Sequence, residues 1–151
     1  MKLEKVLDDQ EIPYKKLWHR PTYTSQDLAA AEHVSGYEVA KPVVVRGARG
    51  FAMCVVAAPD QVDLNKVARL LGEESVRLAT EDEMKSLFPD CELGAEPPVG
   101  NLFGIRTIMD HRLRYDERLF MQIGSHTEAV RMRRDDWEQI TQPIVGAIAR
   151  T

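Results

Sequence analysis

Two consecutive apolar segments constrain the fold of this chain most strongly. Residues 39–46 and 51–58 are apolar and rich in valine, and Gly47-Ala48-Arg49-Gly50 separates them. Apolar, β-branched runs joined by a short turn that contains glycine predict a β-hairpin. Because neither run alternates polar with apolar residues, both strands are expected to lie in the centre of a sheet, with both faces buried.

The segments around this hairpin mix helices and strands. Helical spacing, capping residues and breakers predict helices at 3–12, 24–36, 64–72, 80–88 and from 135 onward, the last kinked at Pro143. Further strands are predicted at 14–18, 76–78, 106–109, 119–123 and 129–133, and a loop at 91–104. Strict alternation of strand and helix is missing and hairpins recur, which indicates an α+β fold with a mixed or mostly antiparallel sheet.

The composition is that of an ordinary globular protein, with 44% hydrophobic and 29% charged residues. A chain of 151 residues is expected to form one domain, 1–151, around a single core. No apolar run approaches the roughly 20 residues that a membrane span needs. Residues 1–5 also lack the apolar core of a signal peptide. We therefore expect a cytoplasmic protein without a membrane partner.

Charge is unevenly distributed along the chain. The net charge of −4 offers no general attraction to nucleic acid, and no helix-turn-helix pattern appears, so DNA is not an expected partner. Between residues 104 and 134, however, seven arginines face four acidic residues, a local excess of three positive charges. This segment forms either a basic face or an ordinary solvated surface of mixed charge.

The sequence signatures of common cofactor and metal sites are missing. The chain has no GxGxxG, P-loop, HExxH or GxSxG pattern. Its four histidines and two cysteines show no metal-ligand spacing and no CxxC pair. We therefore predict no cofactor, no bound metal and no disulfide framework.

Lys41 is the first residue that stands out. It is the one charged residue in the apolar run 39–45. A lysine is rarely fully buried without a partner. Two interpretations are open: its side chain reaches the surface at the edge of the strand, or it lines a cleft and binds an anion.

Two polar loops are the other unusual features. Residues 94–98 read Gly-Ala-Glu-Pro-Pro, where glycine permits close backbone approach and proline fixes φ. Such a loop either presents backbone groups to a small substrate or simply connects a helix to a strand. Gly124-Ser125-His126-Thr127 is a polar turn between two predicted strands. Its histidine is either a hydrogen-bond donor and proton carrier near neutral pH or an exposed turn residue.

Several segments follow one another in a specific order. They are Trp18-His19-Arg20-Pro21, the capped alanine-rich helix, Val39-Ala40-Lys41, residues 63–72 (DLNKVARLLG), residues 78–83 (LATEDE) and the 94–98 loop. This succession resembles the YbaK/prolyl-tRNA-synthetase-associated domain family over nearly the whole chain. The resemblance implies a single α+β domain with a barrel-like sheet flanked by helices.

The resemblance also implies a function. Members of the family are free-standing aminoacyl-tRNA deacylases that act in trans and hydrolyse the ester joining a wrong amino acid to the 3′ end of a tRNA. Water and the terminal ribose hydroxyl are proposed to share the chemistry, without metal or side-chain nucleophile. The implied partners are an aminoacyl-tRNA and an aminoacyl-tRNA synthetase.

Candidate site residues follow from matching these motifs. The candidate catalytic residues are Lys41, Gly94 and His126. The candidate substrate-binding residues are Lys41, Pro42, Ala95, Glu96, Pro97, Pro98 and Ser125. Arg46, Arg106 and Arg112 are candidates for binding tRNA, on charge alone.

One departure from the family pattern leaves a second interpretation open. The family commonly has threonine after the signature lysine, whereas this chain has Pro42, which removes a strand N–H and alters the adjacent cleft wall. The histidine that His126 resembles occurs in some branches of the family only. The alternative is a non-catalytic module of the same fold that binds a tRNA end, another small ligand or a protein.

Overall fold

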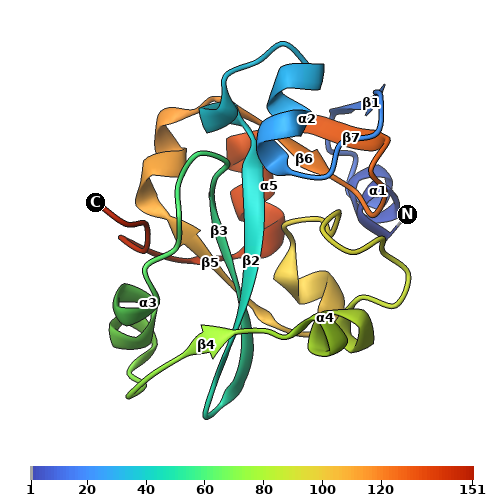
Figure 1. Cartoon of the computed structure of the whole chain (residues 1–151). Helices are drawn as coiled ribbons and strands as arrows, with labels where there is room; N and C mark the ends of the chain where they lie inside the picture. Colours follow the sequence, from blue (N-terminus) through green and yellow to red (C-terminus); the bar gives the residue numbers. More distant parts are fainter. Residues whose placement is uncertain (1) are drawn as a thin grey trace.

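Two β-sheets form the frame of the molecule, described here from a computed structural model for residues 2–151, with side chains from Leu3 onward. One sheet has the strand order β4-β2-β3-β5-β8 and the other the order β1-β7-β6. The strands are β1 (Tyr14–Trp18), β2 (Ala40–Gly47), β3 (Gly50–Ala57), β4 (Arg77–Leu78), β5 (Arg106–Asp110), β6 (Arg118–Gln122), β7 (Glu128–Arg133) and β8 (Ile144–Gly146). The helices are α1 (Lys2–Asp9), α2 (Ser25–Ala31), α3 (Leu64–Leu71), α4 (Glu81–Leu87) and α5 (Arg134–Thr141), with 3₁₀ turns η1 (Gly36–Glu38), η2 (Gly100–Phe103) and η3 (His111–Tyr115). Figure 1 shows their arrangement.

Strand pairing confirms the predicted α+β class with a mixed sheet. The hairpin β2–β3 is antiparallel and places Lys41 opposite Val56, while β3–β5 and β5–β8 are parallel. The barrel-like closure is wrong, because among the described residues no ladder joins the two sheets. The larger sheet ends in very short edge strands, β4 and β8, which offer few backbone groups for closure. An isolated parallel bridge between Val39 and Phe120 is the contact that links them.

Apolar side chains fill three layers around these sheets. The main core lies between the two sheets and includes Leu3 and Leu7 of α1 and Trp137 of α5. A second cluster packs under α3, on the other face of the larger sheet. A third packs α2 against β6 and β7, through Leu28 and Phe120 (Figure 1). No helix within residues 2–151 has the length and apolar character to cross a bilayer.

Local sequence explains most helix ends, and the structure corrects two predictions. The hydroxyl of Thr80 and the carboxylate of Glu83 form the expected capping box at α4. The helix predicted to reach Gly36 instead ends at Ala31, and the chain turns at His33, whose φ is 56°. The predicted kink at Pro143 is also wrong. The helix α5 ends at Thr141, and the residues after the proline form the short strand β8, which pattern analysis missed.

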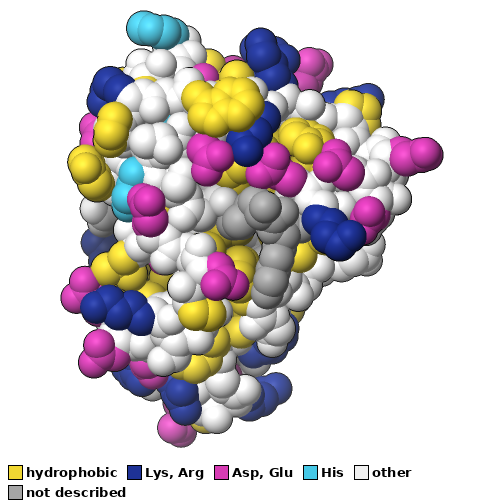
Figure 2. Space-filling view, turned by 90° about the vertical axis from the view of Figure 1, so that its right-hand side faces the viewer, with side chains coloured by type: hydrophobic (Ala, Val, Ile, Leu, Met, Phe, Trp, Pro, Cys, Tyr) yellow, Lys and Arg dark blue, Asp and Glu magenta, His cyan; other side chains and the backbone are white. Residues whose placement is uncertain are grey.

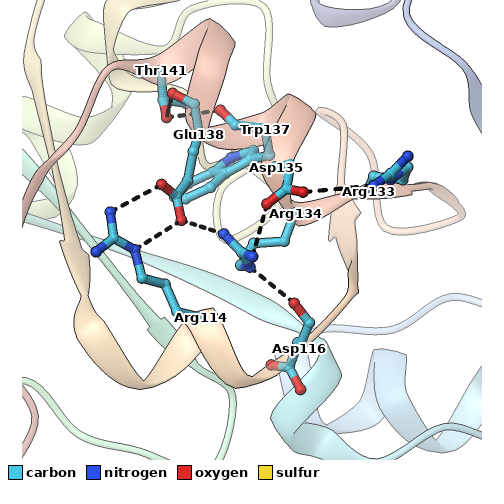
Figure 3. A network of polar contacts seen from close by, with 8 residues as sticks. All are labelled: Arg114, Asp116, Arg133, Arg134, Asp135, Trp137, Glu138 and Thr141. Carbon is cyan, nitrogen blue, oxygen red and sulfur yellow. Dashed lines mark hydrogen bonds and ion pairs between the residues drawn. The ribbon is translucent and has the colours of Figure 1, made fainter.

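A network of ion pairs ties the start of α5 to the segment around η3 (Figure 3). The carboxylate of Glu138 accepts from Arg114 at 3.2 Å and also binds Arg134. The guanidinium of Arg134 donates in addition to the backbone carbonyl of Asp116 at 2.9 Å. This network fixes η3, which leads from the end of β5 toward β6.

Candidate functional site

Lys41 lies at the start of β2 with its ammonium group bound by backbone carbonyls. Its Nζ donates to the carbonyl oxygens of Ala58 at 3.1 Å and Asp60 at 2.5 Å, in the segment that follows β3. Burial lowers the pKa of this ammonium below its ordinary value, and the nearby charge of Asp60 acts in the opposite direction. The side chain therefore neither extends freely into solvent nor enters the core without partners.

Arg112 belongs to the same cluster of charges. Its guanidinium contacts the carboxylate of Asp60 at 3.3 Å and that of Asp110 at 3.2 Å. Asp110 is buried, and its other oxygen accepts the backbone N–H groups of Ile148 and Ala149. The cations Lys41 and Arg112 thus share Asp60 as a common neighbour, which defines the lysine cluster: Lys41, Asp60, Asp110 and Arg112.

The 94–98 loop is held rigidly by the rest of the fold. Gly94 has a φ of 87°, a left-handed conformation that favours glycine, and its N–H donates to the carboxylate of Glu96 at 3.1 Å. Ala95 accepts from the N–H of Gly124 at 2.7 Å. Residues 95–98 are buried, and the carbonyl of Pro98 accepts the indole N–H of Trp137 at 3.0 Å. Glu96 therefore has a role in shaping the loop.

His126 packs against this loop, and the turn that contains Ser125 is joined to it through Gly124. The Nε2 atom of His126 lies 2.9 Å from the carbonyl oxygen of Leu93, and its ring lies 4.9 Å from that of Tyr23. Because a carbonyl can only accept, Nε2 donates the proton in this contact. The Nδ1 atom is buried and has no hydrogen-bond partner within the described residues. The loop cluster comprises residues 93–98, Ser125 and His126.

A buried pair, Gln122 and Thr22, lies beside the loop cluster. The amide of Gln122 donates to the hydroxyl of Thr22 at 3.2 Å, and the N–H of Thr22 donates to the carbonyl of His126 at 2.8 Å. The parallel bridge between Val39 and Phe120 sets Lys41 and Gln122, each two residues further on, at the same level of neighbouring strands. The pair therefore holds the turn at His126 to β6, and none of the hydrogen bonds of Lys41 within residues 2–151 comes from the 94–98 loop.

Pro42 and the three arginines predicted to bind tRNA lie in different parts of the fold. Strand alternation turns Pro42 to the face opposite that of Lys41. Arg46 stands five positions along β2 from Lys41, about 16 Å at the usual rise of a strand. There it contacts Glu83 at 3.7 Å and the ring of Phe51. Arg106 is exposed at the start of β5, near the same end of the sheet. Of the predicted tRNA-binding residues, Arg112 alone adjoins Lys41.

An open groove of about 1090 Å³ flanks the loop cluster on the side of α1 and α4. Figure 2 shows this side of the molecule, with hydrophobic surface among acidic side chains. Its charged lining consists of Glu4, Lys5, Lys16, Asp90, Glu92 and Glu128. Acids outnumber cations there, so the groove repels a phosphate backbone.

Sequence reasoning missed four residues of this arrangement, among them Asp110, which binds Arg112. Asp60 is close to Lys41 because the hairpin register pairs Lys41 with Val56 and the chain then continues past Lys41. Extending the predicted register outward from the turn would have placed Asp60 near Lys41. Gln122 is the one polar residue in the apolar run 119–123, which is the same signal that singled out Lys41. Thr22 carries no comparable signal, since its burial depends on contacts with β6.

Comparison with known proteins identifies the family. The aminoacyl-tRNA editing domain profile matches residues 19–140, so the chain belongs to this family. Among curated proteins, it is 28% identical over 109 residues to a proline–tRNA ligase of Fervidobacterium nodosum and 23% identical over 146 residues to that of Thermosipho africanus. The matches cover 72% and 92% of this chain but only 19% and 26% of the ligases. The chain therefore spans about a fifth to a quarter of those relatives.

Solved structures share the fold. A hypothetical protein superposes with a TM-score of 0.90 at 22% identity, over 99% of this chain and all of the other. A proposed trans-editing enzyme for prolyl-tRNA synthetase gives a TM-score of 0.84 at 22% identity, over 99% of this chain and 96% of that one. These likenesses confirm the α+β editing-domain fold.

Proposed function

We propose that this protein is an aminoacyl-tRNA deacylase that acts in trans in the cytoplasm on mischarged tRNA. The observation that carries the proposal is the family match, which spans Lys41, the 94–98 loop and His126 together. The likeness to proline–tRNA ligases makes tRNA(Pro) the first substrate to test. The reaction adds water to the ester carbonyl, breaks the bond to the ribose oxygen and returns a proton to that oxygen.

Lys41 supplies a fixed positive charge for this reaction. An ammonium group has three protons, and two point to the carbonyls of Ala58 and Asp60. The third proton is available for an oxygen of the terminal nucleotide or of the ester. Because the group is held before substrate arrives and is partly buried, its charge acts on a developing oxyanion without reorganisation.

The loop cluster supplies the other side of the site. Rigid backbone groups of residues 94–98 limit the size of the aminoacyl side chain, and a positioned water needs little further activation to attack an ester. The Nδ1 atom of His126 is a side-chain nitrogen of the loop cluster that lacks a hydrogen-bond partner among the described residues. In this proposal it accepts the proton of the water directly or through one further water.

The test is a hydrolysis assay on a panel of tRNAs charged with alanine, cysteine, serine, threonine or proline, with tRNA(Pro) included for each amino acid. Wild type should release at least one of these amino acids faster than buffer, and Lys41→Ala should not. Failure on every substrate at micromolar enzyme concentration would refute the proposal. Tight binding of an aminoacyl-tRNA without turnover would instead select the non-catalytic binding module.

A further inference from the structure

The outer face of the β1-β7-β6 sheet carries cations that nothing in the fold covers. Helix α2 packs on one half of this face, against Leu17, Phe120 and Ala129. Strand alternation puts four cations on the half of this face beyond α2. Three of them lie two positions from Leu17, Phe120 and Ala129, and the fourth lies four positions from Ala129. We call this half the basic face: Lys15, Arg118, Arg131 and Arg133.

These cations are paired with one another across the strands. Lys15 stands directly opposite Arg131 in the β1–β7 ladder, and Arg118 stands directly opposite Arg133 in the β6–β7 ladder. Like charges in directly opposed positions destabilise a sheet. Two such pairs in one small sheet impose a cost on folding that an anionic partner would remove.

The fold does little to neutralise this repulsion. Within residues 2–151, no ion pair or side-chain hydrogen bond involves Lys15, Arg118 or Arg131. Arg133 contacts Asp135 at 3.5 Å, and that carboxylate lies closer to Arg134, at 2.8 Å (Figure 3). On the opposite face of β1, by contrast, Lys16 is bound by both Glu4 and Glu128 at 3.3 and 3.0 Å. Lys16 is therefore neutralised within the fold, whereas Lys15, Arg118 and Arg131 are not.

We propose that the basic face binds the sugar-phosphate backbone of the tRNA whose 3′ end reaches Lys41. Phe120 lies between Arg118 and Gln122 on β6 and is bridged to Val39, two residues before Lys41. Counted from that bridge, Arg118 is level with residue 37, so one strand spacing and four residues of rise separate Arg118 from Lys41, about 5 and 13 Å. That span is short enough for one RNA end to contact both.

The choice of RNA as the partner rests on the proposed function, and the distribution of charge over the molecule favours this route for the backbone. The groove on the other side of the loop cluster is lined mostly by acids, which repel phosphate. Because the whole chain has a net charge of −4, a polyanion gains attraction only where cations are concentrated. Arginine and lysine that lack protein partners offer phosphate-binding donors without first breaking an ion pair.

The test measures binding of uncharged tRNA by fluorescence anisotropy as a function of salt. The variant Lys15→Gln/Arg118→Gln/Arg131→Gln is compared with a charge-matched control, Lys5→Gln/Arg69→Gln/Lys85→Gln, which removes exposed helix cations. Loss of three phosphate contacts should lower the slope of log K against log salt by roughly 2 to 3, and weaken binding on the order of 100-fold at 0.1 M salt. The control variant should change neither the salt slope nor the affinity by more than a small fraction of these values.

Equal weakening by both triple variants, or unchanged binding by the first, would overturn the inference. Melting followed by circular dichroism checks the fold, and relief of repulsion should leave the midpoint unchanged or higher. If the triple variant does not fold, the single variants Lys15→Gln and Arg118→Gln should each lower the slope by about 0.7 to 0.9. Because the tRNA carries no ester, this result stands whether or not the hydrolysis panel succeeds.

Discussion

The ammonium of Lys41 and the backbone carbonyl of Asp60 lie 2.5 Å apart, so the lysine is bound to the segment that continues its own partner strand. The hairpin register creates this contact, because Lys41 pairs with Val56 and the chain then bends back past it. A lysine that sequence alone would place either at the surface or in a cleft is therefore fixed in position by main-chain atoms. The predictions below concern this arrangement and the loop beside it.

Replacing Lys41 should remove activity without a matching loss of stability. Lys66 is the natural control, because its Nζ also donates to a backbone carbonyl, that of Ala149 at 2.9 Å. Lys41→Ala and Lys66→Ala should each lower the free energy of unfolding by about 1 kcal/mol. Only Lys41→Ala should reduce kcat/KM for ester hydrolysis, by at least about 100-fold if its ammonium stabilises the oxyanion. Equal activity of the two variants would assign Lys41 a purely structural role.

His126→Gln separates proton transfer from support of the loop. A glutamine amide can still donate to the carbonyl of Leu93, but it lacks the basic ring nitrogen. We expect kcat to fall roughly 100-fold while KM changes little. His33→Gln, at an exposed position, provides the comparison and should have wild-type kinetics. Full activity of His126→Gln would show that this residue only supports the loop.

Gly94→Ala tests whether the loop conformation matters to the site. The φ of 87° should make this substitution cost roughly 1 kcal/mol of stability, and the added methyl would lie 3.6 Å from the His126 ring. Gly104→Ala has a similar φ of 75° and no atom within 4 Å of the new methyl. Both variants should lose similar stability in urea melts, but only Gly94→Ala should alter the ranking of substrates in the hydrolysis panel. Identical rankings would argue against a pocket at the loop.

Asp116 should make stability depend on pH in the acid range. Burial and the nearby Glu38 raise the pKa of its carboxyl from 3.8 to about 6, against the opposing effect of Arg134. Between these two values the folded protein binds the proton more tightly than the unfolded chain, so stability falls as pH rises, and the penalty is complete above pH 6.

Asp116→Asn should remove this penalty. Above pH 6 the variant should be more stable than wild type by roughly 1 kcal/mol after allowance for solvent screening. The difference should vanish below pH 4, and urea melts across this range would measure it. The contact between Arg134 and the backbone of residue 116 remains in the variant, which isolates the carboxyl group. A difference that does not change with pH would contradict the assignment.

Sequence patterns predicted those parts of the fold that depend on neighbours along the chain. The hairpin around residues 47–50 and the capping box of Thr80 and Glu83 are local, and the structure confirms both. Strand β8 escaped prediction because three residues carry no usable period, and its pairing with β5 joins positions far apart. Whether the sheets close into a barrel likewise depends on contacts between residues far apart in the sequence.

The candidate site shows the same division. Lys41 was visible as a charge in an apolar run, and the 94–98 loop through its glycine and prolines. The roles of Glu96 and Thr22 were not visible, since each depends on which backbone or amide group the fold brings to it. An unusual residue in a sequence pattern indicates a candidate site, but tertiary contacts determine which group that residue binds.

The bond from the Trp137 indole to the carbonyl of Pro98 has a consequence for how the protein is made. The two residues are separated by 39 positions, so the ribosome synthesises the loop well before the helix that fastens it. A nascent chain that ended before α5 would carry Lys41 and the 94–98 loop, bound to Gly124 but without the bond from Trp137. Maturation of the candidate site is therefore a late event in translation, later than completion of the β2–β3 hairpin that holds its lysine.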